Sequence, residues 1–382
     1  ATAADGQKAT QTITVTVLPV DEIAQKLGEI GGELRTGLRE HAFDSLQAAL
    51  AINEGLLSED DRCASANRGP VAAQVSGDRT AQQAGVSYAQ SLTDCRSQTR
   101  VKVDGGAYLT RRDGDVDTRG FGTVRIEHDA TDRVTVGAAL TSSFADDELG
   151  GFASGAISDR TLQVDVFARW RLTDDLRAGA FLGAGRAWYD FDLVEDGLTL
   201  SGEMTGERLL YGAMLSGDLT VGGRPVTVDA LVSHASEDLG AASLDAAYLG
   251  ERRSGIAFQV GEVDATRVSV PAHIGLLGGN GASYRLVLSP GVLCEDRAAS
   301  GSGLTCGYQL GARLSADVGS RDGLVLRVRH EEVDGRIAQL LSVGYAIRFG
   351  RSEGLALALT MDQRAGAQGG DSALMLRLTT GR

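Results

Sequence analysis

The chain has 382 residues, 42% of them hydrophobic, and a formal net charge of −14. The hydrophobic fraction excludes a disordered chain, and the acidic balance argues against a nucleic-acid partner, whose binding needs concentrated Lys and Arg. Glycine is abundant (51) and proline scarce (5), without the G-X-Y period of collagen. No apolar run approaches the ~20 residues of a membrane-spanning helix. A transmembrane β-barrel remains open, because only every second residue of its strands is apolar.

Residues 1–20 contain one strand-like segment. In residues 9–18, ATQTITVTVL, threonine alternates with Ile13, Val15 and Val17. A single strand is not stable alone, so this segment needs a partner sheet. It resembles the closing strand of a bacterial Ig-like or cadherin-like repeat whose body would lie upstream. The alternative is an edge strand added to the domain that follows.

An amphipathic helix is predicted over residues 21–60. Asp21 is a suitable N-cap. One apolar stripe recurs at helical spacing, formed by Ile23, Leu27, Ile30, Leu34 and Leu38. Gly31-Gly32 interrupts this stripe at a cost of up to ~1 kcal/mol per glycine. The Ser/Ala/Gln/Asn-rich residues 61–99 are expected to be a linker with little regular structure.

From about residue 100 to residue 382, the hydrophobic pattern changes to a period of two. The clearest alternation occurs in residues 162–170, 308–317, 324–331 and 341–349. In each window the apolar residues occupy one parity, and small, glycine or charged residues occupy the other. This pattern predicts strands with one apolar face and one polar face.

Two kinds of connection separate these expected strands. Six short turns, such as Thr131-Asp132-Arg133, alternate with longer polar connections expected at 145–159, 237–254, 295–304 and 365–371. This asymmetry is typical of outer-membrane barrels, whose short turns face the periplasm. The sequence therefore predicts a closed antiparallel up-and-down β-barrel over residues 100–382. Fourteen strands are counted, with twelve as the alternative.

Charged residues on the polar parity are expected to line the lumen, because an Arg facing lipid near the midplane would cost about 2–4 kcal/mol. These residues are Arg125, Asp165, Arg169, Arg313, Arg327, Arg329, Arg348 and Arg377. Glycines inside strands, among them Gly179 and Gly183, either give curvature or make room for a bulky element against the wall. The helix over residues 21–60 would be such an element.

A repeat end, an amphipathic helix and a β-barrel, in this order, resemble a type V autotransporter translocator. The resemblance implies a monomeric protein in the outer membrane of a Gram-negative bacterium, with its helix in the pore and its N-terminus toward the cell exterior. It implies contacts with outer-membrane lipid, barrel-assembly machinery, periplasmic chaperones and the chain's own passenger. The family usually has twelve strands and a C-terminal aromatic residue, whereas this chain has fourteen predicted strands and ends in Arg382.

The expected function is that of a translocator and anchor that exports and displays an N-terminal, adhesin-like passenger, without enzymatic activity. The alternative is an outer-membrane channel or transporter whose N-terminal helix is periplasmic. Asn53 lies in the predicted helix and is similar in place to the pore asparagine of autotransporters that cleave their own passenger. The neighbouring sequence does not specify that chemistry.

The four cysteines suit an oxidising compartment. Cys294 and Cys306 bracket a predicted outer loop and are expected to form one disulfide, which leaves Cys63 and Cys95 as the second pair. This pairing is one of three connectivities and rests on proximity. No cofactor and no metal site is expected, because no Cys-x-x-Cys motif with nearby histidine occurs. No G-x-S-x-G motif indicates a hydrolase.

Overall fold

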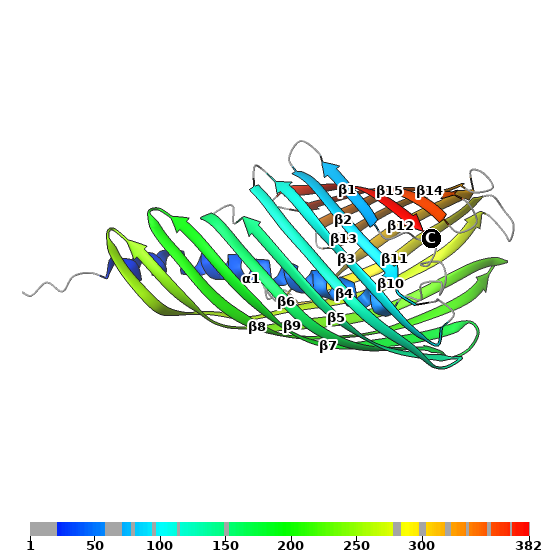
Figure 1. Cartoon of the computed structure of the whole chain (residues 1–382), viewed down its shortest axis with the longest axis horizontal. Coiled ribbons are helices and arrows are strands. Elements are labelled where there is room, and N and C mark those ends of the chain that lie inside the picture. The colour runs from blue at the N-terminus through cyan, green and yellow to red at the C-terminus, as the bar shows by residue number, and fades with distance from the viewer. Residues whose placement is uncertain are drawn as a thin grey trace, which may run out of the picture.

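A computed structural model describes residues 21–57, 71–77, 81–93, 97–112, 115–148, 153–277, 284–297, 303–317, 322–333, 336–349, 353–366 and 369–381. In this part of the chain, one helix, α1 (Glu22–Leu57), precedes sixteen strands (Figure 1). The strands are β1 (Val71–Gly77), β2 (Ala81–Ser91), β3 (Thr99–Arg112), β4 (Asp115–Thr131), β5 (Val134–Glu148), β6 (Ser154–Arg171), β7 (Leu176–Glu195), β8 (Leu198–Val221), β9 (Arg224–Tyr248), β10 (Glu251–Leu277), β11 (Tyr284–Arg297), β12 (Thr305–Asp317), β13 (Asp322–Val333), β14 (Arg336–Phe349), β15 (Glu353–Gly366) and β16 (Gly369–Gly381).

All sixteen strands form one antiparallel up-and-down sheet in sequence order. The predicted count of fourteen, with twelve as the alternative, is therefore wrong for the sheet. Strands β3–β16 occupy the predicted barrel region, and β1 and β2 lie in the segment 61–99 that was expected to be a linker. Their small residues give little contrast between the two faces, which hid the period of two. Among the register pairs of the described strands, none joins β1 to β16, so closure is not shown.

The sheet has an outer apolar face and an inner face of mixed character. On β6, Leu162, Val164 and Val166 are exposed, whereas the alternate residues Asp165 and Phe167 are buried. Strand periodicity explains this difference, because successive side chains point to opposite faces. The period-two pattern predicted from the sequence therefore corresponds to the two faces of the observed sheet.

The longest strands extend far beyond the length that a bilayer requires. Strands β8, β9 and β10 contain 24, 25 and 27 residues, whereas a tilted transmembrane strand needs about 9–11. The long loop expected at 237–254 is therefore wrong: β9 and β10 continue through this region and are joined only by Leu249-Gly250. Likewise, most of 145–159 belongs to β5 and β6.

Helix α1 lies along the inner face of the sheet, where it contacts β6–β10 (Figure 1). Its first turn is next to the β7–β8 turn, since Lys26 Nζ is 3.6 Å from Asp196 Oδ2. Its last residue, Leu57, lies beside Gly179 near the opposite end of β7. We call the rim with the Asp196-Gly197 turn the distal rim and the rim with the Gly222-Gly223 turn the proximal rim. The helix therefore runs from the distal to the proximal rim.

The apolar core is formed mainly between α1 and the extended strands. Of the predicted stripe, Ile23, Ile30, Leu34 and Leu38 are buried, and Leu27 is partly buried against the same cluster. Their neighbours in this cluster are Leu193, Leu198, Leu200, Leu239, Leu244, Val260 and Val263. This apolar support explains why the distal segments remain paired strands instead of opening into loops.

Cys294 and Cys306 form a disulfide between neighbouring positions of β11 and β12, as predicted. Cys63 and Cys95 lie outside the described residues, as do residues 1–20 with the expected repeat end. Among the described residues, no helix combines the length and apolar character needed to cross a membrane.

Candidate functional site

Polar contacts join α1 to the inner face of the sheet at three successive levels. The first level is His41, whose imidazole is buried between two strands. Its Nδ1 is 2.8 Å from Asp147 Oδ2 on β5, and its Nε2 is 3.1 Å from Asp159 Oδ2 on β6. Arg119 on β4 holds the same Asp147 carboxylate with an Nη2–Oδ2 distance of 2.5 Å. A protonated imidazole is attracted to both carboxylates and thereby links the helix to two strands.

The second level is a buried charge pair beside Ser45. Arg208 on β8 and Glu237 on β9 are 2.7 Å apart, and neither side chain is exposed to solvent. The Tyr189 hydroxyl on β7 donates to Glu237 over 2.6 Å and accepts from Arg208 over 2.9 Å. Arg208 Nη2 also donates to the Ser45 hydroxyl of α1 over 3.0 Å. The hydrogen bond to Ser45 therefore connects this charge pair, which lies on the sheet, to the helix.

The third level is Asn53, which is completely buried. Its Nδ2 donates to Asp165 Oδ1 on β6 over 2.9 Å, and Gln163 Nε2 donates to the same oxygen over 2.7 Å. Gly183 on β7 lies opposite Asp165. A Cβ on Gly183 would overlap the Asp165 carboxylate and would lie 3.4 Å from Asn53 Nδ2. The glycine therefore makes room for the contact between helix and wall, one of the two roles considered for the strand glycines.

Glu54, the residue after Asn53, connects α1 to two further strands. Glu54 Oε1 accepts a 2.5 Å hydrogen bond from the Ser233 hydroxyl on β9, and Glu54 Oε2 lies 3.6 Å from Arg267 Nη1 on β10. Asn53 and Glu54 thus attach the final turns of the helix to three strands.

We predict that Gly183→Ala destabilises the folded protein by about 1–3 kcal/mol, because the added methyl group must displace Asp165 or the helix. The matched control is Gly55→Ala in α1, where a Cβ would meet nothing within 4 Å. The control should be neutral or slightly stabilising because alanine favours the helix. Urea unfolding followed by tryptophan fluorescence measures both. Equal midpoints for the two variants would contradict the packing role of Gly183.

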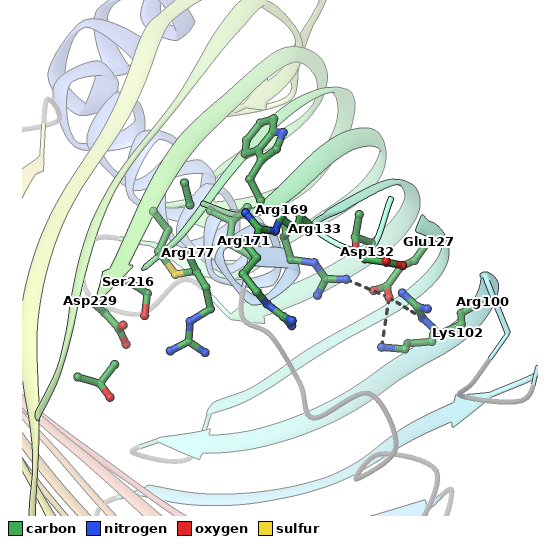
Figure 2. A pocket seen from close by; sticks show the side chains of 16 residues that line it. Arg100, Lys102, Glu127, Asp132, Arg133, Arg169, Arg171, Arg177, Ser216 and Asp229 are labelled. Carbon is green, nitrogen blue, oxygen red and sulfur yellow. Dashed lines mark hydrogen bonds and ion pairs between the residues drawn. The ribbon is translucent and has the colours of Figure 1, made fainter. Parts of the chain in front are cut away.

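A cavity of about 240 Å³ lies at the proximal end of α1, with Leu57 in its wall (Figure 2). Its charged lining consists of Arg100, Lys102, Arg133, Arg169, Arg171, Arg177, Glu127, Asp132 and Asp229. Glu127 is the centre of one cluster, at 3.4 Å from Arg100, 3.5 Å from Lys102 and 3.0 Å from Arg169. The last turn of α1 contains no basic residue. Positive charge from the sheet therefore faces the negative end of the helix dipole.

The predicted lumenal residues occupy different positions in relation to the helix. Asp165 bonds Asn53, Arg169 lines the cavity, and Arg125 is buried 3.4 Å from Asp104. Arg313 and Arg329 are exposed, and Arg329 lies 3.3 Å from Glu331. The side chains of Arg327, Arg348 and Arg377 lie outside the described residues.

The sequence interpretation missed the arginines that contact α1. Arg119, Arg208 and Arg267 have polar contacts with α1, and Arg253 contacts Asp21 just before it; none of the four was among the predicted lumenal residues. Arg208 lies within residues 197–210 and Arg267 just beyond residues 255–264, two stretches in which the alternation of apolar and polar residues is too weak to assign a side chain to one face. The residues next to Arg208 do indicate its face. Leu209 and Tyr211 occupy the opposite parity and are exposed on the outer face, so Arg208 belongs to the inner face.

No family model matches the chain, and no curated protein matches it. Among solved structures, the translocator domain of the autotransporter NalP from Neisseria meningitidis is 12% identical with a TM-score of 0.44, over 89% of this chain and 95% of that chain. The CymD monoaromatic hydrocarbon channel is 11% identical with a TM-score of 0.44, over 84% and 90% of the two chains. These similar structures are outer-membrane β-barrels, and the similarities assign no activity.

The ferric preacinetobactin receptor BauA from Acinetobacter baumannii is 7% identical with a TM-score of 0.43, over 78% of this chain and 54% of the receptor. This chain therefore spans about half the length of that protein.

Proposed function

We propose that this chain is the translocator and outer-membrane anchor of an exported N-terminal passenger, with its sheet closed into a barrel and α1 in the pore. The observation that carries the proposal is the direction of α1, which begins at the distal rim and ends at the proximal rim. A chain that had passed outward through the barrel would leave its final segment in this direction. The N-terminal sequence would then be at the distal, extracellular side.

The outer face supports insertion in a membrane. On β8, the outward residues Leu209, Tyr211 and Leu215 are exposed and apolar, whereas Glu203 and Glu207, closer to the distal rim, are exposed and charged. The boundary between the two sets lies between Glu207 and Leu209. An apolar band of limited height is what a bilayer requires of a transmembrane barrel. The distal part of β8 would then project beyond the membrane.

The contacts of α1 suit a helix that stays in the pore once the passenger has crossed. Its apolar stripe packs on the distal strands, and His41, Ser45 and Asn53 bond the sheet at successive depths. A segment in transit would lack this specific set of partners. In this proposal the action of the protein is mechanical, with lipid, assembly machinery, periplasmic chaperones and its passenger as partners and with no catalytic step. An adhesin-like passenger remains an expectation from residues 9–18.

Antibody labelling of an epitope tag placed before Ala1 tests the proposal. We expect labelling on intact cells, because the distal rim is extracellular in this proposal. A second tag between Gly222 and Gly223 at the proximal rim should be labelled only after the outer membrane is permeabilised. The reverse pattern would instead support the alternative, a channel or transporter with a periplasmic N-terminal helix.

A further inference from the structure

Strand β10 has a long edge that no described strand covers. It pairs with β9 from Glu251 onward, but its pairing with β11 begins only at Ala265. Within the part of the chain that the structure describes, the segment Glu251–Asp264 therefore has an open edge on the side away from β9, and most of its residues are exposed. An open strand edge presents unpaired backbone groups and is a template for another strand.

Two arginines of α1 donate to backbone oxygens of this segment on either side of Gly261, whose positive φ of 95° interrupts the regular alternation of the strand. Arg35 Nε donates to the backbone oxygen of Gln259 over 3.0 Å, and Arg39 Nη2 donates to that of Glu262 over 2.9 Å. In a strand, the N–H and C=O of one residue point toward the same neighbour. The N–H of Gln259 therefore also faces the open side, and a guanidinium group has no acceptor to offer it. A strand backbone would supply both partners.

The face of α1 above this edge is made of small residues. At 100° per residue, Ala24, Gly28 and Gly32 lie on the same face as Arg35 and Arg39. A Cβ added to Gly28 or Gly32 would meet nothing within 4 Å. The space beside the β10 edge therefore has a floor of small residues that can receive apolar side chains.

The chain itself brings a suitable strand to this place. Asp21, at the start of α1, forms an ion pair with Arg253 on the open edge. The strand-like segment 9–18 ends only three residues before Asp21. If the chain reverses over Pro19–Asp21, this segment runs antiparallel to β10, because β10 and α1 both run from the distal toward the proximal rim.

We propose that the open edge of β10, Glu251–Asp264, is a β-augmentation site and that its occupant is residues 9–18 of the same chain. Alternate residues Ile13, Val15 and Val17 would face the small-residue side of α1, and the threonines would face solvent. Residues 9–18 are then an added edge strand of this sheet rather than the end of an upstream repeat, and the expectation of an adhesin-like passenger, which depends on that repeat, loses its support. Such a strand is an anchored starting point on which preceding chain can fold.

Disulfide trapping tests this pairing in the otherwise full-length chain, with Cys63→Ser and Cys95→Ser as background. The test pairs are Val15→Cys or Ile13→Cys, each combined with Ala257→Cys or Gln259→Cys. We expect intramolecular crosslinks with an antiparallel register. Ile13→Cys should therefore crosslink to a β10 position closer to Asp264 than the position to which Val15→Cys crosslinks. The yield should exceed that of Val15→Cys with Ser201→Cys, on exposed β8, by ~10-fold or more: both pairs are tethered within one chain, and only the proposed strand pairing holds the test cysteines side by side.

Ala241→Cys with Gln259→Cys is the positive control, since these residues pair across β9 and β10. Retained heat-modifiable migration on gels shows that each variant is folded. If the positive control crosslinks and no test pair does, the proposal is wrong. Crosslinks at dimer mass would assign the edge to a second copy and would also overturn it. Because trapping requires only the folded sheet and its N-terminal segment, the result is independent of which side of the membrane the epitope experiment finds.

Discussion

Replacing residues 21–57 with a Gly/Ser segment of equal length is expected to raise single-channel conductance in planar bilayers several-fold. Helix α1 lies along the inner face of the sheet, and a helix with its side chains is ~10–12 Å across. A flexible segment cannot keep the packing of Ile23, Leu34 and Leu38 or the bonds of Asn53. Water and ions would therefore enter the space that the helix fills in the proposed barrel.

Replacing residues 1–18 in the same way is the matched control, because α1 remains intact. Its conductance should equal that of the unmodified chain. Equal conductance of the helix-replaced and unmodified proteins would contradict the role of α1 as the pore-filling element. Circular dichroism of the two variants checks that the sheet has formed in both.

Arg208→Met is expected to destabilise the folded protein by about 3–5 kcal/mol. The substitution leaves Glu237 without its 2.7 Å charge partner at a position with no solvent exposure, and an unpaired buried charge carries a penalty of this size. It also removes the donor to Ser45, so the hold of the sheet on α1 is weakened. Urea unfolding in detergent or lipid, followed by tryptophan fluorescence, measures the change in unfolding free energy.

The double variant Arg208→Met/Glu237→Gln provides the control. With both charges removed, the loss should be clearly smaller than in the single variant, because breaking one partner costs more than replacing the pair. If Arg208→Met lowers the unfolding free energy by less than ~1 kcal/mol, water reaches Glu237. The contact between α1 and the sheet at Ser45 would then not exclude solvent.

The alternation of apolar and polar residues allowed much of the sheet to be predicted. Leu162, Val164 and Val166 are exposed on the outer face, and Asp165 on the other parity is buried. The period is reliable here because lipid or core on one side imposes a strong contrast between alternate positions. The contrast is weak in β1 and β2, whose small residues suit either face, and this part of the sheet was missed.

The extent of the strands could not be predicted from local pattern. Residues 237–254 have the polar, Gly/Ala/Ser-rich composition of a loop, yet Leu239 and Leu244 are buried in the core with α1. Its large apolar residues, Leu239, Leu244, Tyr248 and Leu249, lie five, four and one positions apart, so the segment shows no period of two. Its partner on α1 lies about two hundred residues away in sequence, and a periodicity analysis of one segment contains no information on such a contact.

Among the site residues, the helix stripe was predictable and its polar partners were not. Leu34 and Leu38 are buried as helical spacing indicates. Which arginine reaches α1 depends on strand register and on the angle at which the helix crosses the strands. Arg208 bonds Ser45, whereas Arg169, on the same inner face, lies beyond the end of α1 in the basic cavity.

The N-terminal amphipathic helix, an antiparallel sheet with two chemically distinct faces, and the Cys294–Cys306 pair were all predicted from the sequence. The helix and the sheet can be predicted because their periods, 3.6 and two residues, are visible within a short stretch of sequence. The number of strands, their distal extension, the position of Asn53 against Asp165 and Gly183, and the open edge of β10 became known from the three-dimensional fold. These features depend on register and helix placement, which arise from contacts between residues far apart in the chain.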